Sequence, residues 1–540
     1  MLYGYTASNM GRTEAEKLLP SSNMTDVERM LSETEEASMI LRATGRTPVE
    51  GFPDIRDMLR RIHATLALSS RELLQTAQCL RACRNAGDVL RNSASAVLLK
   101  QLAERLPSHR MVEEKIMSCI LSEDEIADNA SSELARIRRQ MKLANEKVRE
   151  KLNQMIRSAT FQKYLQEPII TVRDGRYALP VKAEYRAQVP GLIHDTSGSG
   201  ATLFIEPSVA VDLGNEYKRL QGEESREIER ILANLTAYVE PVAPDLMTGL
   251  EVLAKLDLVF AKAFLAGEMN AVRPSINESG KISIRKGIHP LLNRDTAVPV
   301  DIWLGEDFST LIITGPNTGG KTVTLKTLGL LTVMTMSGMF IPAETGSKIS
   351  LFEEVYADIG DEQSIEQSLS TFSSHMKNTV QILRNADGRS LVLLDELGAG
   401  TDPVEGAALA QAILEKLFNC GAKTVATTHY SEIKAFAMTH PGMQNASMEF
   451  DVDRLCPTYH LHIGIPGKSN AFEISKRLGL DPAVIERANE YLQKQDIAFE
   501  SVIAGAEAAR REAEEHREKP GLNTRKRRRP VALPKKKERS

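Results

Sequence analysis

A glycine-rich stretch that ends in Lys-Thr is the part of the sequence whose residue types and spacing predict chemistry. Residues 315–322 read Gly-Pro-Asn-Thr-Gly-Gly-Lys-Thr, after the apolar run 311–313 and before a helical pattern over 323–336. This order predicts a strand, a phosphate loop and a helix, in which backbone N–H groups and the positive end of the helix dipole surround phosphates. A chance match is disfavoured because the strand, loop and helix patterns all occur in the order that a phosphate loop requires. The residues predicted to bind a nucleotide are Gly315, Pro316, Asn317, Thr318, Gly319, Gly320, Lys321 and Thr322.

Acidic residues downstream supply the second half of the predicted nucleotide site. The apolar run 390–394 predicts a buried strand that brings Asp395 and Glu396 to the carboxyl edge of an α/β sheet. We expect Lys321 to reach the β- and γ-phosphates, and Thr322 and Asp395 to ligate Mg²⁺. Glu396 is predicted to orient and polarise the attacking water as a general base. The predicted cofactors are therefore ATP and Mg²⁺.

His429 and Ser370 are two further candidate site residues, suggested by their places at the ends of predicted elements. His429 comes directly after the strand-like run 423–428, where its ring would hydrogen-bond a γ-phosphate; a structural histidine is the alternative. Ser370 lies at the start of an amphipathic helix, where serine is also a preferred N-cap. The order of phosphate loop, serine-rich helix start, Asp-Glu strand and strand ending in His resembles the ABC-class ATPases. That resemblance implies that Ser370 caps the γ-phosphate held by a second copy, so hydrolysis requires a homodimer.

Composition indicates an ordinary globular protein of several domains. The chain has 540 residues, of which 42% are hydrophobic. No apolar run approaches the length of a membrane span and the first residues do not resemble a leader, so we expect a cytoplasmic protein with no membrane partner. The five cysteines are scattered, which fits a reducing compartment, and Cys79 and Cys83 are expected to pack on one helix face.

Charge is unevenly distributed along the chain. The net charge is −4, but residues 521–540 carry nine basic side chains and one acidic side chain, which leaves −12 for the remainder. This pattern predicts local basic patches and argues against one broad DNA-binding face. The tail is either a nucleic-acid-binding extension or an out-of-frame end without function, and the abrupt change in composition slightly favours the latter.

The first half of the chain has the pattern of a lever with a β tip. A long charged helix is expected over 131–157, alternating strands follow residue 167, and a second long charged segment covers 213–238. The second helix would run antiparallel to the first. Lys182, Arg186 and His194 in the tip are candidate contacts to a phosphate backbone, and a solvated hairpin is the equal alternative.

The sequence is similar to the MutS family of mismatch-repair-type ATPases. The motifs that carry this resemblance lie at 315–322, 370–372, 395–401 and 426–430, and it continues through 445–450, 457–459, 464–467 and 471–480 into a helix-turn-helix dimerisation segment. The motifs at 172–177, 180–185 and 194–207 resemble the second bacterial branch, which lacks the mismatch-reading and connector domains. That resemblance implies a bacterial protein that binds branched DNA and suppresses homologous recombination, and it also implies a connection to stalled ribosomes.

Two departures from the family limit what the resemblance implies. The Phe-Glu pair of mismatch readers has only the chance match Phe352-Glu353-Glu354 inside the ATPase, so direct mismatch reading is not expected. The branch also carries a C-terminal Smr nuclease domain, whereas here the helical pattern 504–519 breaks at Pro520-Gly521 and only the basic tail follows. Endonuclease activity is therefore not expected of this chain.

The resulting fold prediction is a multidomain α and α/β protein, with a helical core and lever, a small β insertion and an ABC-type P-loop ATPase domain. The predicted function is an ATP-dependent clamp on branched or duplex DNA. The alternatives are a ribosome-associated ATPase that binds rRNA and splits stalled ribosomes, and a non-catalytic nucleotide-binding scaffold. The predicted segments are 1–166 (helical core and outgoing lever), 167–207 (β clamp insertion), 208–279 (returning lever helix and core), 280–468 (ATPase), 469–495 (helix-turn-helix), 496–519 (charged helix) and 520–540 (basic disordered tail).

Overall fold

The computed structural model describes residues 1–94, 96–316, 319–360, 371–467 and 471–491. Their contacts divide the described residues into two compact units: the first lies within 1–17 and 36–261, and the second lies within 18–35 and 262–491. Helices and mixed sheets occur together, which confirms a multidomain protein with α and α/β structure. None of the helices in the described ranges combines the length and the apolar character that a membrane span requires.

The first unit is mostly helical. Helix α4 (Ser70–Asn92) begins with a capping box, in which Ser69 and Glu72 satisfy each other's backbone N–H groups. Cys79 and Cys83 lie on its buried face, and burial raises the pKa of both thiols, that of Cys83 to about 12. The other α-helices and strands of this unit are α1 (Asn9–Glu16), α3 (Arg56–Arg61), α5 (Leu98–Ala103), α6 (Arg110–Cys119), β1 (Ile120–Ser122), β2 (Glu125–Ile126), α7 (Ser132–Arg157), α8 (Ala159–Gln162), β3 (Thr171–Arg173), β4 (Arg176–Lys182), β5 (Gly191–Thr196), β6 (Thr202–Pro207) and α9 (Ser208–Val239). Helices α2 (Met24–Thr44) and α10 (Ala243–Glu268) have residues in both units.

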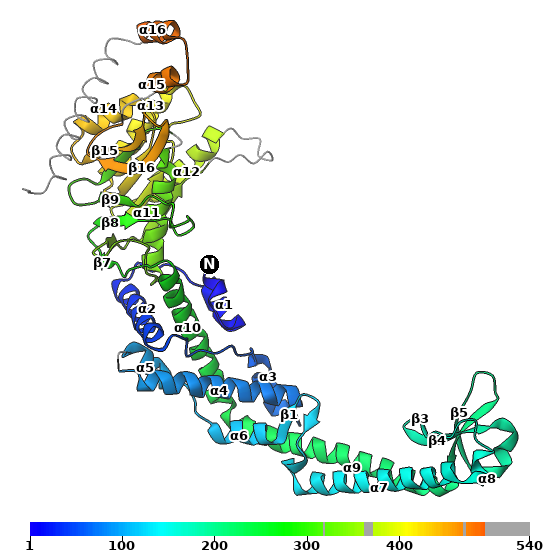
Figure 1. Cartoon of the computed structure of the whole chain (residues 1–540). Coiled ribbons are helices and arrows are strands. Elements are labelled where there is room, and N and C mark those ends of the chain that lie inside the picture. The colour runs from blue at the N-terminus through cyan, green and yellow to red at the C-terminus, as the bar shows by residue number, and fades with distance from the viewer. Residues whose placement is uncertain (95, 317–318, 361–370, 468–470, 492–540) are drawn as a thin grey trace, which may run out of the picture. The chain divides into compact units, whose positions relative to one another are not determined.

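Helices α7 and α9 form a long antiparallel arm, with the sheet β3–β6 at its far end (Figure 1). The antiparallel direction follows from the contacts: Arg138 Nε donates to Glu224 Oε1 at 2.7 Å, and further along α7 Ala144 packs with Leu220. Leu134, Ile137, Ala144, Val148 and Leu152 are buried and recur at helical spacing. Ile137 and Ala144 pack with Leu220 of α9, whereas Val148 and Leu152 belong to a cluster that includes the tip sheet. The predicted helix out, β tip and helix back are confirmed.

The tip is a four-stranded sheet with the order β3-β4-β6-β5. Asp174 and Gly175 both have positive φ, 50° and 69°, as the predicted Asp-Gly hairpin turn between β3 and β4 requires. Strand β5 was not predicted, because its polar residues His194 and Asp195 interrupt any alternation of apolar side chains. It pairs antiparallel with β6.

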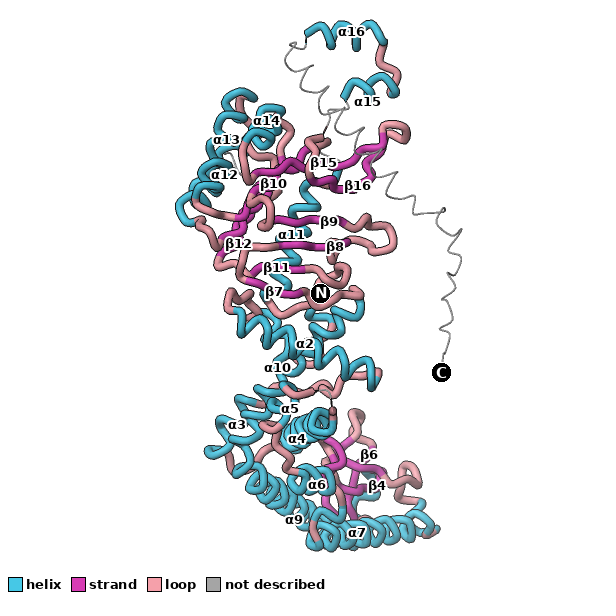
Figure 2. Tube along the Cα trace, turned by 90° about the vertical axis from the view of Figure 1, so that its left-hand side faces the viewer, coloured by secondary structure: helices cyan, strands magenta, loops and turns pink. Residues whose placement is uncertain are grey.

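The second unit is built around a six-stranded sheet of order β12-β13-β14-β10-β15-β16, and a four-stranded sheet of order β7-β11-β8-β9 lies in the same unit (Figure 2). All neighbours in the larger sheet are parallel except the pair β15 and β16. Its carboxyl edge therefore collects the ends of five strands. The strands are β7 (Ser275–Asn277), β8 (Ile282–Gly287), β9 (Val300–Leu304), β10 (Thr310–Thr314), β11 (Lys348–Ser350), β12 (Glu354–Asp358), β13 (Ser390–Leu394), β14 (Lys423–Thr427), β15 (Met443–Asp451) and β16 (Cys456–Ile463); the helices are α11 (Lys321–Met336), α12 (Thr371–Asn385), α13 (Pro403–Asn419), α14 (Ser431–Thr439), α15 (Ala471–Arg477) and α16 (Pro482–Tyr491).

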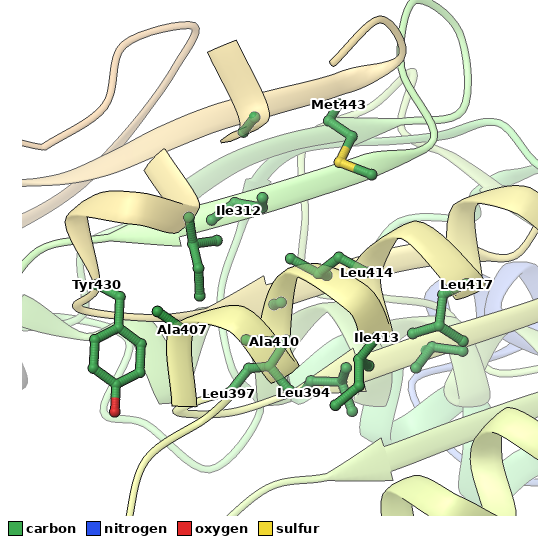
Figure 3. Close-up of a cluster of buried hydrophobic side chains, with 14 of the residues drawn as sticks. Ile312, Leu394, Leu397, Ala407, Ala410, Ile413, Leu414, Leu417, Tyr430 and Met443 are labelled. Atoms are coloured by element: carbon green, nitrogen blue, oxygen red, sulfur yellow. The ribbon is translucent and has the colours of Figure 1, made fainter. Parts of the chain in front are cut away.

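Helices cover both faces of the larger sheet. Val392 and Leu394 belong to the same cluster as Leu414 of α13; Leu394 and Leu414 are labelled in Figure 3. Leu393, on the opposite face, approaches Gly329 of α11. Each of these leucine and valine side chains is 1% exposed or less. Truncating Leu414 to alanine would lower the free energy of unfolding by about 2–5 kcal/mol. The core thus fixes the strand ends that carry the polar residues.

Candidate nucleotide-binding site

The glycine-rich loop connects the buried strand β10 to helix α11, as predicted. Gly320 is the N-cap of α11 and has φ 92°, and Gly315 directly after β10 has φ 133°, so both positions favour glycine. A Cβ on Gly319 would lie 3.2 Å from Met448 Cβ on strand β15. The backbone therefore approaches β15 closely and turns its first helical N–H groups toward the carboxyl edge of the sheet.

Lys321, the first residue of α11, is 2% exposed. Its Nζ donates to the carbonyl of Gly315 at 2.7 Å, within the loop itself. Burial lowers the pKa of this ammonium, and the nearby carboxylates of Glu396 and Asp395 partly oppose that effect. A buried cation with a lowered pKa gains stability from an anion brought beside it, so this position suits a phosphate.

Asp395 follows β13 and lies next to the start of α11. The Thr322 hydroxyl donates to Asp395 Oδ2 at 2.6 Å, and the aspartate is 8% exposed. A hydroxyl and a carboxylate are oxygen donors of the kind that Mg²⁺ selects in phosphate sites. The two residues therefore fit a magnesium site that a nucleotide phosphate would complete.

Glu396 has an unusual backbone conformation. Its φ is 47°, which a non-glycine residue adopts at a cost of order 1–3 kcal/mol, and such strain is common at functional sites. Its N–H donates to the Thr427 hydroxyl at 2.8 Å, and Thr427 donates in turn to Asp395 Oδ1. One buried hydroxyl on β14, the strand between β13 and β10, therefore fixes both acidic residues.

His429 lies two residues beyond the end of β14, exposed at the same edge of the sheet. Its ring centroid is 4.4 Å from that of Tyr430, whose hydroxyl donates to the Gly398 carbonyl at 3.0 Å. Partial desolvation, followed by the charge of Lys321, lowers the pKa of His429. The lowered pKa favours the neutral imidazole at neutral pH.

A cavity of about 310 Å³ adjoins the phosphate loop. Its walls include Gly320, Val323 and Met448, with Tyr459 at its side; Tyr459 has φ 63° and is 45% exposed. The Tyr459 ring passes so close to the loop that a Cβ on Gly320 would lie 3.1 Å from its Cδ1. An apolar cavity with one aromatic wall suits a flat heterocycle held next to a phosphate site.

Comparison with known proteins places this chain in a family. Residues 311–496 match the model of MutS domain V. Endonuclease MutS2 of Acetivibrio thermocellus is 53% identical over 510 residues, which cover 94% of this chain and 64% of that protein. The chain belongs to the MutS family, in its second branch. Endonuclease MutS2 of Clostridioides difficile is 49% identical over 520 residues, and that of the Geobacillus strain WCH70 is 50% identical over 518 residues. The chain spans 64 to 66% of the length of these relatives.

The MutS-type motifs come together at one edge of one sheet. The loop, Asp395, Glu396 and His429 follow three strands, β10, β13 and β14, that are neighbours in the order β13-β14-β10. Their chemical roles stay predictions. Asn317, Thr318 and Ser370 lie outside the described residues, as do the predicted segments 496–519 and 520–540 and parts of 469–495.

The three predicted nucleic-acid contacts in the tip have partners within the first unit. His194 Nε2 donates to Glu206 Oε2 at 2.7 Å, Arg186 donates to two carbonyls of its own segment, and Lys182 Nζ lies 3.5 Å from the carbonyl of Lys163. All three side chains are half-buried. Their role in nucleic-acid contact stays a prediction, and their positions favour a role in holding the tip sheet together.

Two residues of the MutS site were not predicted as site residues. Thr427 was placed only within a strand, because the sequence does not reveal that β14 lies beside β13 and brings its hydroxyl to Asp395. Tyr459 lies in the 457–459 motif of the family resemblance, but it is far from the loop in sequence, so no role at the nucleotide site was assigned to it. Both are positioned by strand pairing.

Proposed function

We propose that this MutS-family chain is an ATPase with an ABC-type P-loop site. The observation that carries the proposal is the cluster at the carboxyl edge of the sheet: a buried lysine on a glycine loop, a hydroxyl bonded to one carboxylate, and a second acidic residue whose backbone is held at positive φ. Lys321 would neutralise the β- and γ-phosphates, and the Tyr459 cavity would hold the base. Thr322 and Asp395 would hold Mg²⁺, which when bound withdraws charge from the phosphate oxygens.

In the proposed reaction Glu396 orients a water molecule and accepts its proton. The Thr427 hydroxyl fixes the Glu396 backbone, so the carboxylate has a defined starting position, and this reduces the reorganisation that the reaction requires. His429, neutral at the working pH because of its lowered pKa, would hydrogen-bond the γ-phosphate oxygen. Glu396 follows β13, whereas Thr427 ends β14 and His429 lies two residues beyond it.

We further propose that the active form is a homodimer. Helix α16 and the link between α15 and α16 expose apolar side chains: Val484 of α16 is 51% exposed, and Leu478 and Leu480 in the link are 74% and 45% exposed. Among the described residues, neither helix has a buried one. This is expected of a helix pair whose apolar side chains become buried only when a second copy binds. In the ABC-type arrangement Ser370 of one copy completes the site of the other, so that ATP joins the copies and hydrolysis releases them.

The proposed polymer target is branched or duplex DNA, gripped between the arms to suppress recombination. Helix α7 supports a backbone-reading role, because Lys142, Lys147 and Lys151 are exposed on it between Arg139 and Arg157. The relatives are named endonucleases, and this chain spans part of their length. Cleavage of nucleic acid by the longer proteins is therefore compatible with an ATPase role for this chain.

Phosphate release, gel shift and sedimentation test this proposal together. We expect magnesium-dependent phosphate release that Lys321→Ala abolishes, and a nucleotide-stabilised shift of four-way junctions. Replacing Lys142, Lys147 and Lys151 by glutamate should weaken binding on every sequence and flatten its salt dependence by about one unit of slope for each lysine–phosphate pair that the replacement removes. Co-sedimentation with ribosomes and no junction shift would identify rRNA as the target. Nucleotide binding without phosphate release would support the non-catalytic scaffold and contradict the proposed ATPase activity.

A further inference from the structure

Asp358, at the end of β12, is a buried acidic residue that the proposed mechanism does not use. It is 7% exposed and sits on the strand next to β13. Its carbonyl accepts the N–H of Asp395 at 2.8 Å, which continues the β12–β13 ladder to the proposed magnesium ligand. The main chain of Asp358 is therefore hydrogen-bonded to Asp395 of the proposed nucleotide site.

The side chain of Asp358 points to a different element, helix α12. His375 Nδ1 donates to Asp358 Oδ2 at 2.9 Å, and Asn378 Nδ2 donates to Oδ1 at 3.1 Å. The two donors are three residues apart and so share one face of α12. Both carboxylate oxygens are thus used to hold a single helix at two points.

The first turn of α12 also meets the segment that follows Glu396. Gly400 has φ 87°, and a Cβ there would lie 3.3 Å from Phe372 Cβ and 3.5 Å from the Phe372 nitrogen. Helix α12 is therefore held between the strand end that precedes it and the turn after the acidic pair. Its hydrophobic side, with Ile382, packs into the core of the sheet.

From this geometry we propose that Asp358 is a positioning residue: it couples Asp395 to α12 through the His375 and Asn378 bonds, and so sets where the start of α12 is presented to a second copy of the chain. This inference rests on the proposed ATPase function and on the dimer. Ser370, the predicted trans donor, directly precedes α12 in the sequence. The coupling gives a physical route by which occupation of one site would affect the partner's site.

The chemistry of the contact favours a coupling role over simple packing. Helix α12 already has an apolar face in the core, so it needs no buried carboxylate to stay attached. A carboxylate accepting two side-chain bonds defines both the axial position and the rotation of the helix, because the bonds come from residues one turn apart. A displacement of about 1 Å at a reacting group can cost about 100-fold in rate.

The test uses the full chain with His375→Ala, Asn378→Ala and Asp358→Asn. Gln381→Ala, an exposed position of the same helix, is the matched control. We expect kcat to fall about 10- to 100-fold in the first two variants, as for residues that orient a site, while the KM for ATP changes less than about twofold. ATP-dependent dimerisation, measured by light scattering, should weaken in parallel with kcat. Asp358→Asn keeps an acceptor oxygen and should lose less.

A double-mutant cycle separates coupling from reduced stability. His375→Ala combined with Asp358→Ala should have the kcat of the worse single variant, because Asp358→Ala removes the acceptor and His375→Ala the donor of the same hydrogen bond. Unchanged kcat in all variants of an active wild type, or independent additive effects, would overturn the proposal. So would a rise in KM that matches the fall in kcat. If the wild-type chain releases no phosphate or stays monomeric with ATP, the proposed function has failed before the coupling is tested.

Discussion

Replacing Thr427 by valine removes the one hydroxyl that joins the two acidic residues. Valine has nearly the same shape, so the fully buried position stays filled. The change leaves the Glu396 N–H without its 2.8 Å acceptor and the Asp395 carboxylate without one donor. An unmade buried bond of this kind costs about 1–3 kcal/mol, and removing a bond to a charged group costs about 1.5–3 kcal/mol.

These costs should appear in magnesium binding and turnover. Residues that orient a metal ligand typically contribute about 10- to 100-fold to affinity or activity. We therefore expect the Mg²⁺ concentration for half-maximal phosphate release to rise by about that factor in Thr427→Val, and kcat to fall similarly. Affinity for ATP without Mg²⁺ should change little, since Lys321 and the loop are untouched.

The chain provides a closely matched control for this experiment. Thr424 lies on the same strand, is equally buried, and its Oγ1 has no hydrogen-bond partner among the described residues. Thr424→Val should therefore leave the magnesium dependence unchanged and keep or slightly raise thermal stability. Equal magnesium curves for the two variants would refute the role assigned to Thr427.

Four further outcomes follow from the site. Lys321→Ala should abolish tight ATP binding in a fluorescence titration, and a normal dissociation constant would contradict its role. Glu396→Gln should bind ATP but turn over slowly and accumulate as a nucleotide-bound dimer in light scattering; rapid turnover would exclude a general base there. Tyr459→Ala should raise the Kd for ATP more than that for inorganic triphosphate, because only ATP has a base to stack. Burial and the Lys321 charge lower the folded pKa of His429 by penalising its protonated form. Wild type should therefore lose stability relative to His429→Asn as pH falls from about 6.5 through the folded pKa, which urea titrations of both proteins would measure.

The sequence predicted the elements of this protein better than the contacts between them. The phosphate loop and the helical arm follow from local patterns, glycine spacing in one case and apolar spacing in the other, so both were predicted. The contacts of Thr427 and Asp358 depend on which strands are neighbours, and the order β12-β13-β14-β10 leaves no local trace in the sequence. His194 shows the opposite case. The sequence made it a candidate for nucleic-acid contact, whereas its ring hydrogen-bonds to the buried carboxylate of Glu206.

Complementation between two inactive variants tests the central claim most directly. Lys321→Ala removes the nucleotide site of one chain, and Ser370→Ala removes the predicted donor of the other; mixed dimers keep one site in which an intact loop meets an intact serine from the partner. The account predicts negligible phosphate release by either variant alone and clear release on mixing. Full activity of Ser370→Ala alone, or no release from mixtures that form dimers, would contradict it.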